Sequence, residues 1–221
     1  MPSKKEIGLF RRYLLLWFKK NKRDYPWRET HDPFRILIAE MMLQRTKADQ
    51  VLSVYNNFFS KFNSPEEVIH TDLKELRKIL YPIGLKWRVK NFKAVCNSLI
   101  KNFDGKIPDI RSRLLILPGV GEYVAGITLS LAFNKPEWII DSNIVRIFKR
   151  YFGISTTKEG RRDKHVIELA KMYIAVREPR RANLALLDFA ALICVPKNPK
   201  CTLCPLFNTC RYYSLIRNKK S

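Results

Sequence analysis

Hydrophobic residues along this chain recur mostly at intervals of three and four positions, which is the spacing of an amphipathic helix. On a basic first segment, one helical face is apolar and carries Ile7, Phe10, Leu14, Trp17 and Phe18. Residues 34–43 are apolar on almost every side and predict a mostly buried helix, and apolar groups repeat at helical spacing through 49–62. Alternation with a period of two is rare. The pattern therefore predicts an all-α fold.

Several helix boundaries are marked by residue type. Ser64, Pro65 and Glu67 form a helix start, with serine at the N-cap, proline at the first helical position and glutamate three residues after the cap. Other glycines and prolines divide the chain into segments of ordinary helix length: Gly84, Gly105, Pro108, Pro118, Gly153 and Pro179. At 221 residues, the chain is long enough for one domain or two small ones.

Positive charge dominates the composition. Lysine and arginine number 42 against 20 aspartates and glutamates, which gives a net charge of +22 at pH 7. Such an excess indicates a polyanionic partner, nucleic acid first and an anionic membrane surface second. The apolar runs are far shorter than the roughly 18 residues of a membrane-spanning helix, and no secretory signal is recognisable. We therefore expect an intracellular protein without a membrane segment.

Four of the five cysteines lie close together near the C-terminus, in the pattern Cys-x6-Cys-x2-Cys-x5-Cys: Cys194, Cys201, Cys204 and Cys210. Four thiolates suit either a [4Fe–4S] cluster or a tetrahedral zinc ion. Structural zinc sites more often pair two Cys-x2-Cys knuckles, and only one is present, so iron–sulfur is favoured. Lys197 and Lys200 lie on the same loop, where they can face phosphates. The fifth cysteine, Cys96, has apolar neighbours and is expected in the core.

The sequence Leu-Pro-Gly-Val-Gly at 117–121 predicts a short turn between two helices. Glycines in such a turn let backbone N–H groups approach a phosphate, so a helix–hairpin–helix that binds the DNA backbone is indicated. The candidate contacts are Leu117, Gly119, Val120 and Gly121. A dinucleotide-binding loop is a weaker interpretation, because it needs a small residue at Val124 and a βαβ setting. A plain turn between helices is the remaining alternative.

Two carboxylates lie at positions that suit a catalytic role. Asp141 precedes an amphipathic run, where an aspartate is usually a helix N-cap, and a capped carboxylate is also well oriented for catalysis. Glu40 lies within an apolar run, where burial tends to raise the pKa of a carboxyl group. Its alternative role is structural, in a pair with one of the many arginines.

Taken together, the hairpin, the downstream aspartate and the cysteine tail resemble the helix–hairpin–helix/Gly-Pro-Asp superfamily of DNA glycosylases. The resemblance covers about 25–210 and points to the iron–sulfur branch, with endonuclease III and the adenine mismatch glycosylase. It implies a six-helix barrel at 25–135, with the hairpin at about 110–133. A second helical domain, formed by 1–24 and 136–221, would carry the [4Fe–4S] cluster at 194–210.

Individual residues indicate which member of the iron–sulfur branch this chain resembles most. Pro26-Trp27 and the run from Glu40 to Thr46 look like the adenine enzyme, in which the matching glutamate is catalytic. Endonuclease III has a Schiff-base lysine two residues after the last hairpin glycine, where this chain has Tyr123. Without an amine there, no imine with the sugar can form, so we expect a monofunctional enzyme with little or no AP lyase activity.

The choice between thymine and adenine is harder. Adenine-specific relatives carry an additional C-terminal domain, whereas this sequence ends eleven residues after Cys210. A short chain with Tyr123 is similar to the thymine–DNA mismatch glycosylases of thermophilic archaea, which remove thymine or uracil opposite guanine. Lys86-Trp87 is a departure from endonuclease III and from the adenine mismatch glycosylase, which both tend to have a Gly-Tyr pair at this place.

The resemblance implies roles for the candidate residues. Asp141 would stabilise the sugar cation and orient the attacking water, Glu40 would position a water or the leaving base, and Tyr123 would contact that base. The residues expected to fill the space of the flipped base are Gln44, Arg45 and Trp87. We expect a cytoplasmic, DNA-associated monomer that binds double-stranded DNA.

Three other functions stay open from the sequence alone. A non-catalytic DNA-binding module would share the charge and the hairpin but would not need Asp141 or Glu40. An adenine-specific glycosylase would share nearly every motif. A redox protein would explain the cysteines but not the charge. The sequence contains no Walker loop, no serine-hydrolase elbow and no His-Glu-x-x-His motif, which excludes those enzyme classes.

Overall fold

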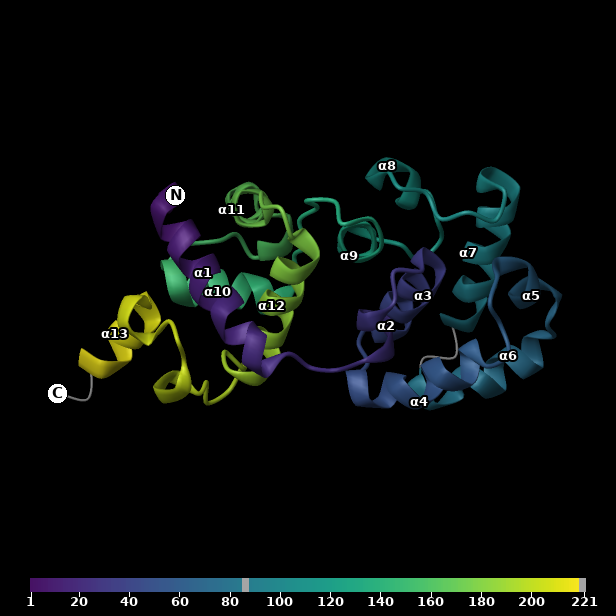
Figure 1. The fold of residues 1–221 in the computed structure, drawn as a ribbon, viewed down its shortest axis with the longest axis horizontal. Coiled ribbons are helices and arrows are strands. Elements are labelled where there is room, and N and C mark those ends of the chain that lie inside the picture. Colours follow the sequence, from purple (N-terminus) through teal and green to yellow (C-terminus); the bar gives the residue numbers. More distant parts are fainter. Residues whose placement is uncertain (85–87, 219–221) are drawn as a thin grey trace. The chain divides into compact units, whose positions relative to one another are not determined.

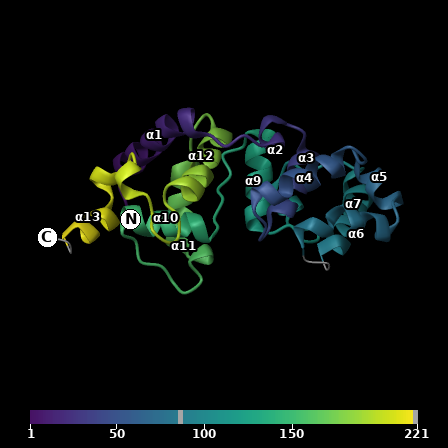
Figure 2. The same cartoon turned by 90° about the horizontal axis from the view of Figure 1, so that it is seen from below.

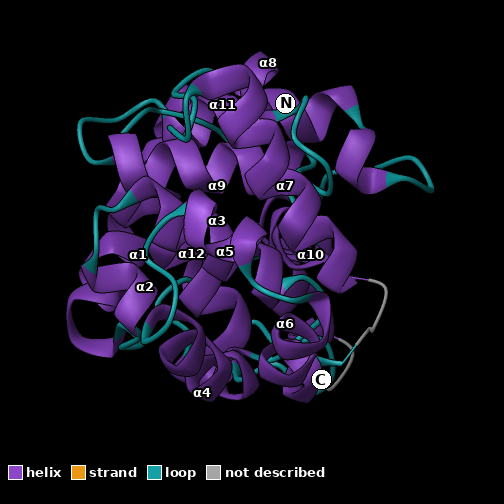
Figure 3. Cartoon of the chain, turned by 90° about the vertical axis from the view of Figure 1, so that its right-hand side faces the viewer, coloured by secondary structure: helices purple, strands orange, loops and turns teal. Residues whose placement is uncertain are grey.

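The structure is a computed structural model that describes residues 1–84 and 88–218. In those residues every regular element is a helix (Figure 1). Figure 3 shows the same chain coloured by secondary structure. The prediction of an all-α fold is confirmed. The chain divides into two compact units, Met1–Arg23 with Asn134–Ser221, here called the terminal unit, and Asp24–Phe133, the central unit.

Short helices follow one another closely in the central unit. They are α2 (Pro26–Glu29), α3 (Pro33–Leu43), α4 (Ala48–Phe59), α5 (Pro65–His70), α6 (Leu73–Leu80), the 3-10 turn η1 (Tyr81–Ile83), α7 (Arg88–Phe103), α8 (Arg111–Leu114) and α9 (Glu122–Phe133). The most extensive packing is of α3 on α9 and of α5 on α7. Figure 2 shows α4, α5, α6 and α7 gathered together.

Short polar side chains begin two of these helices. The Asp32 carboxylate accepts hydrogen bonds from two N–H groups in the first turn of α3, and Pro33 occupies the first helical position. Ser64 accepts a hydrogen bond from the Glu67 N–H at 3.4 Å, so the predicted start of α5 is confirmed. Each cap satisfies backbone N–H groups that have no partner inside the helix.

The core of the central unit is aromatic. The ring centroid of Phe58 lies 5.0 Å from those of Phe59 and Phe62, and Trp27 is almost fully buried. Cys96 has no exposed surface, which confirms its predicted place in the core. Each large apolar side chain buried in this way contributes about 1.5–3 kcal/mol.

Both ends of the chain contribute to the terminal unit. Its helices are α1 (Lys4–Asn21), α10 (Ser142–Phe152), η2 (Gly160–Arg162), α11 (Lys164–Ile174), α12 (Pro179–Leu192), η3 (Cys201–Leu203), η4 (Phe207–Thr209) and α13 (Arg211–Asn218). Helix α1 packs along α12 (Figure 1), and the Phe10 ring lies 4.7 Å from that of Tyr151. An ion pair between Arg23 and the buried Asp188, at 2.7 Å, joins the segment after α1 to α12.

No helix in the described part of the chain combines the length and the apolar character that crossing a membrane requires.

Candidate active site and cysteine loop

Asp141 stands immediately before α10, and its carboxylate caps that helix. Its Oδ1 accepts hydrogen bonds from the backbone N–H groups of Asn143 and Ile144, at 2.9 and 2.8 Å. Its Oδ2 accepts one from the side-chain amide of Asn143 at 2.7 Å. These three hydrogen bonds give the half-buried carboxylate a single orientation. The capping role is confirmed, and the same geometry would serve a reaction that needs a fixed negative charge.

A hydrogen-bonded chain runs from this carboxylate to the cysteine loop, defined as residues 194–210. Arg146 Nη1 donates to the side-chain oxygen of Asn143 at 2.7 Å. The same guanidinium donates through Nε to the carbonyl of Cys194 at 2.9 Å and through Nη2 to that of Ala190 at 3.1 Å. Burial lowers the pKa of Arg146, yet a guanidinium stays charged at neutral pH. Arg146 therefore connects the support of Asp141 to the loop.

Glu40 is a buried carboxyl group in α3, only 4% exposed. Among the described residues, no hydrogen-bond partner reaches its Oε2. Burial raises the pKa of Glu40 to about 7, and the positive charge of Arg28 opposes only part of this rise. At neutral pH the group is therefore divided between its neutral and charged forms, so it can both give and take a proton.

Tyr123 lies in the first turn of α9, half-buried, and packs against the core of the central unit. Because α9 packs on α3, the fold brings the helices of Tyr123 and Glu40 together within that unit. Asp141 belongs to the terminal unit. The side chain at position 123 is a phenol, which cannot form an imine with a sugar aldehyde.

The predicted turn at 117–121 joins α8 to α9. Gly119 has φ +80°, a left-handed backbone conformation that favours glycine, and a Cβ there would also lie in a tight contact, 3.2 Å from the side-chain nitrogen of Asn91. A Cβ at Gly121 would meet nothing within 4 Å, which leaves the start of α9 open. The side chains of Leu117 and Val120 are buried, 2% and 6% exposed. Any contact of these two residues with DNA would therefore come from their backbone.

Gln44 and Arg45 follow the end of α3. The Gln44 amide donates to the Gly119 carbonyl at 3.0 Å, which ties this turn to the hairpin. Arg45 is exposed and has φ +57°, a conformation that costs a non-glycine residue about 1–2 kcal/mol. Backbone strain of this kind is common at functional sites. Trp87, the third candidate, lies outside the described residues.

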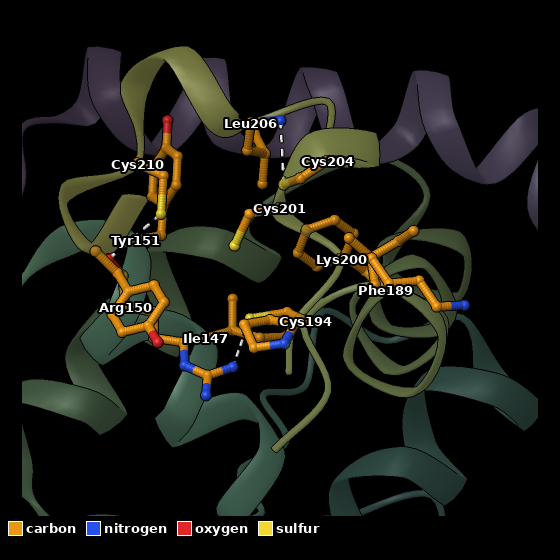
Figure 4. Close-up of a pocket in the computed structure, with 13 residues that line it drawn as sticks. Ile147, Arg150, Tyr151, Phe189, Cys194, Lys200, Cys201, Cys204, Leu206 and Cys210 are labelled. Atoms are coloured by element: carbon orange, nitrogen blue, oxygen red, sulfur yellow. Dashed lines mark hydrogen bonds between the residues drawn. The ribbon is translucent and has the colours of Figure 1, made fainter. Parts of the chain in front are cut away.

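Four thiols of the cysteine loop line one hollow in the terminal unit: Cys194, Cys201, Cys204 and Cys210. Figure 4 shows them around this space, with Arg150, Tyr151 and Leu206 beside them. Burial raises the pKa of Cys204 to about 12, so a thiolate there needs a compensating positive charge. Lys197 and Lys200 on the same loop are both exposed.

The sulfur atoms are supported by N–H donors. The Leu206 N–H donates to Cys204 Sγ at 3.4 Å, and Arg150 donates to Cys194 Sγ at 3.6 Å. Over the described ranges, no three His, Cys, Asp or Glu side chains are placed to bind a single metal ion. The four thiols border one space, and four sulfur donors of this kind suit an iron–sulfur cluster or a tetrahedral metal ion.

Sequence reasoning missed Asn143, Arg146 and Arg150 as supports of the site. Arg150 donates to the carbonyls of Val195 and Pro196 at 2.7 and 2.8 Å. The available signal was the spacing of two arginines four residues apart on one face of α10. The carbonyls that accept from these two arginines belong to the end of α12 and to the cysteine loop, and no sequence pattern identifies a backbone acceptor.

The class of protein can now be stated. The sequence profile of the HhH-GPD superfamily of base excision DNA repair proteins matches residues 38–173, a span that holds Glu40, the hairpin and Asp141. The chain belongs to this superfamily, and the resemblance drawn from the motifs is confirmed.

Individual relatives narrow the comparison. The thymine/uracil-DNA glycosylase of Methanothermobacter thermautotrophicus is 37% identical over 212 residues, which cover 96% of each chain. A solved structure of a thermostable thymine-DNA glycosylase, also 37% identical, matches with a TM-score of 0.91 over 96% of this chain and 98% of that one. The adenine DNA glycosylase of Buchnera aphidicola subsp. Baizongia pistaciae is 30% identical over 212 residues, 96% of this chain and 60% of that protein.

Proposed function

We propose that this protein is a monofunctional DNA glycosylase that hydrolyses the bond between deoxyribose and a thymine or uracil mispaired with guanine. The observation that carries the proposal is the Asp141 carboxylate, held by three hydrogen bonds at the start of α10. It stands in a chain that is similar over nearly its whole length to a thymine/uracil-DNA glycosylase. The proposed substrate is double-stranded DNA, bound by a monomer in the cytoplasm.

DNA would be held through its phosphates. The open start of α9 presents backbone N–H groups without helical partners, and Lys197 and Lys200 add positive charge. Binding of this kind weakens steeply as salt rises. The mispaired nucleotide is then turned out of the helix, which costs less for a mismatch than for a Watson–Crick pair. Gln44 and Arg45 are proposed to fill the space that the base leaves.

Hydrolysis would proceed through a sugar with cationic character. The bond from C1′ to the base nitrogen breaks and its electron pair leaves with the base, while a water oxygen bonds to C1′. Asp141 stabilises the cation and takes the proton of that water. Glu40, with its pKa raised by burial to about 7, would give a hydrogen bond or a proton to the departing base. Tyr123 would contact the same base.

AP lyase activity is not expected. Strand cleavage by β-elimination needs an amine that forms an imine with C1′, and the position two residues after the hairpin holds Tyr123. The product is therefore an intact strand with an abasic site.

A [4Fe–4S] cluster is proposed as the cofactor, held by Cys194, Cys201, Cys204 and Cys210. Four sulfur donors around one hollow, with N–H groups directed at two of them, fit such a cluster. When bound, it would supply four iron–thiolate bonds that hold the cysteine loop in one shape. Lys197 and Lys200 would then be presented to phosphates from a rigid loop.

The test is base release from end-labelled duplexes that contain T·G, U·G or A·G, each divided into samples with and without hot alkali. Strand breaks at T·G and U·G that require alkali are the expected result. The second candidate, an adenine mismatch glycosylase, is favoured by the 30% identity to such an enzyme, and breaks at A·G alone would establish it. Breaks without alkali would contradict the assignment of Tyr123.

A further inference from the structure

Two hydrogen bonds join three loops of the central unit at the end of α3. The Gln44 amide donates to the carbonyl of Gly119 in the hairpin at 3.0 Å. Two residues later, the Thr46 hydroxyl donates to the carbonyl of Ile83 in η1 at 3.3 Å. The turn that carries Arg45 therefore lies next to the hairpin on one side and next to η1 on the other. The three loops form one continuous edge of the unit.

Tyr81 is the first residue of η1, and its side chain is 71% exposed. Its backbone continues the helical conformation of α6, with φ −53° and ψ −43°. Pro82 follows it, and the Gly84 N–H closes the turn on the Tyr81 carbonyl at 3.0 Å. The aromatic ring is thus presented to solvent from a backbone of defined shape.

The exposed face of α6 leads to this ring. Lys74, Arg77 and Lys78 precede Tyr81 by seven, four and three positions, so all four side chains share one side of the helix. Each of them is exposed, whereas Leu76, Ile79 and Leu80 face the core. The four residues Lys74, Arg77, Lys78 and Tyr81 are called the α6 strip.

The acidic residues of α6 are engaged elsewhere. The Asp72 carboxylate caps the helix by accepting from the Lys74 N–H at 3.3 Å. Glu75 pairs with Lys61 at 2.8 Å. The strip therefore presents three cations in a row that ends in an aromatic ring. Cations that follow a backbone, with an aromatic ring on which a base can stack, are the features by which proteins hold unpaired nucleotides.

We propose that the α6 strip is an additional DNA-binding surface, on which Lys74, Arg77 and Lys78 bind phosphates and the Tyr81 ring stacks on a base. The inference rests on the proposed function for the identity of the polyanion. The strip ends at the edge that also carries Arg45 and the hairpin, so the stacked base belongs to a nucleotide close to the mismatch. Tyr81 in η1 thereby stabilises the opened DNA helix in addition to Gln44 and Arg45, which lie on the turn after α3.

The experiment measures the affinity of the full protein for a T·G duplex by fluorescence anisotropy at several salt concentrations. All variants carry Asp141→Asn, so that the substrate is not consumed. Tyr81→Ala is expected to weaken binding about 5- to 150-fold at every salt concentration, and Tyr81→Phe to restore it, because stacking needs the ring and not the hydroxyl. The double variant Arg77→Gln/Lys78→Gln is expected to lower the salt slope by about one to two, since each lost phosphate contact removes about 0.9.

Helix α1 supplies matched controls, because it also carries an exposed tyrosine and exposed lysines. Tyr13→Ala and the double variant Lys4→Gln/Lys5→Gln are expected to bind as the parent does, apart from a small general effect of charge. An equal fall in salt slope for the two double variants would show that only net charge matters, and equal losses for the two tyrosine variants would show that the Tyr81 ring has no special role; either result would overturn the inference. So would a Tyr81→Ala variant that binds like the parent.

The experiment distinguishes a wrong assignment of the α6 strip as a DNA-binding surface from a wrong assignment of the glycosylase reaction. Base release by the protein with Asp141 intact is measured in parallel on the same duplex. If thymine is released while the strip variants bind normally, only the strip is refuted. If no base is released but the strip variants lose affinity as described, the strip is supported and the proposed reaction is not.

Discussion

Replacing Glu40 by glutamine would remove the charge from a carboxyl group that is 4% exposed and whose Oε2 has no hydrogen-bond partner in the described structure. Burial raises the pKa of this group from 4.5 to about 7. A difference of about 2.5 in pKa corresponds to about 3 kcal/mol, at 1.36 kcal/mol for each tenfold change in proton affinity. The ionised carboxyl group therefore destabilises the folded protein by about this amount.

The pH dependence has a definite direction. Because the pKa is higher in the folded state, the folded protein holds this proton more tightly than the unfolded chain does. The destabilisation is absent below pH 4.5, grows between pH 4.5 and about 7, and is complete above that range. Glu40→Gln is expected to stabilise the protein by up to about 3 kcal/mol at pH 8 relative to its effect at pH 5. For a chain of this size that is roughly 6–12 °C in melting temperature.

The assay is a series of thermal melts of the wild type and Glu40→Gln between pH 5 and pH 8. A buried amide without partners costs about 1–3 kcal/mol at every pH, so the change with pH is the diagnostic quantity. Glu159→Gln, at an exposed carboxylate, is the matched control and is expected to show no such change. Base release by Glu40→Gln is expected to fall about 100-fold or more while stability at pH 8 rises, as for the loss of a general acid or base.

Two results would refute this reasoning. A difference in melting temperature that is the same at pH 5 and pH 8 would mean that Glu40 does not titrate in this range. Greater stabilisation at pH 5 than at pH 8 would mean that the carboxylate has a partner in solution and that its pKa is lowered.

Other substitutions test the remaining assignments. Asp141→Asn keeps a side chain that caps helices well, so DNA binding is expected to persist while base release is lost; turnover near that of the wild type would remove Asp141 from the mechanism. Tyr123→Lys is expected to introduce an adduct that borohydride traps on abasic DNA, and its absence would show that position 123 lies away from C1′. Arg150→Lys keeps the charge but loses the forked hydrogen bonds to the carbonyls of Val195 and Pro196. We expect this variant to lose about 2 kcal/mol of stability. If a cluster is present, its visible absorbance is expected to fade faster than in the wild type, and an unchanged rate of fading would show that Arg150 does not hold the loop.

Local features of the sequence determined the secondary structure and several helix starts. Ser64 before proline and Asp141 before an amphipathic run both cap helices, because capping depends on residues within a few positions of each other. The buried place of Cys96 followed from its apolar neighbours in the same way. Helix ends were less predictable: the repeat through 49–62 extends past the end of α4 at Phe59. Phe62 still packs in the core from beyond that helix.

Only the tertiary structure decided which groups support one another. The carbonyls that accept from Arg146 and Arg150 lie more than forty positions away in the chain, and backbone acceptors have no residue-type signature. The Ile83 carbonyl, which accepts from the Thr46 hydroxyl and joins η1 to the turn after α3, also lies far from its donor in the sequence and likewise has no residue-type signature. The tertiary structure likewise decided that the side chains of Leu117 and Val120 face the core, whereas the raised pKa of Glu40 was predicted from the apolar run around it. Residue types and spacing could indicate the chemistry, whereas contacts between distant segments set the protonation and orientation of the groups that would perform it.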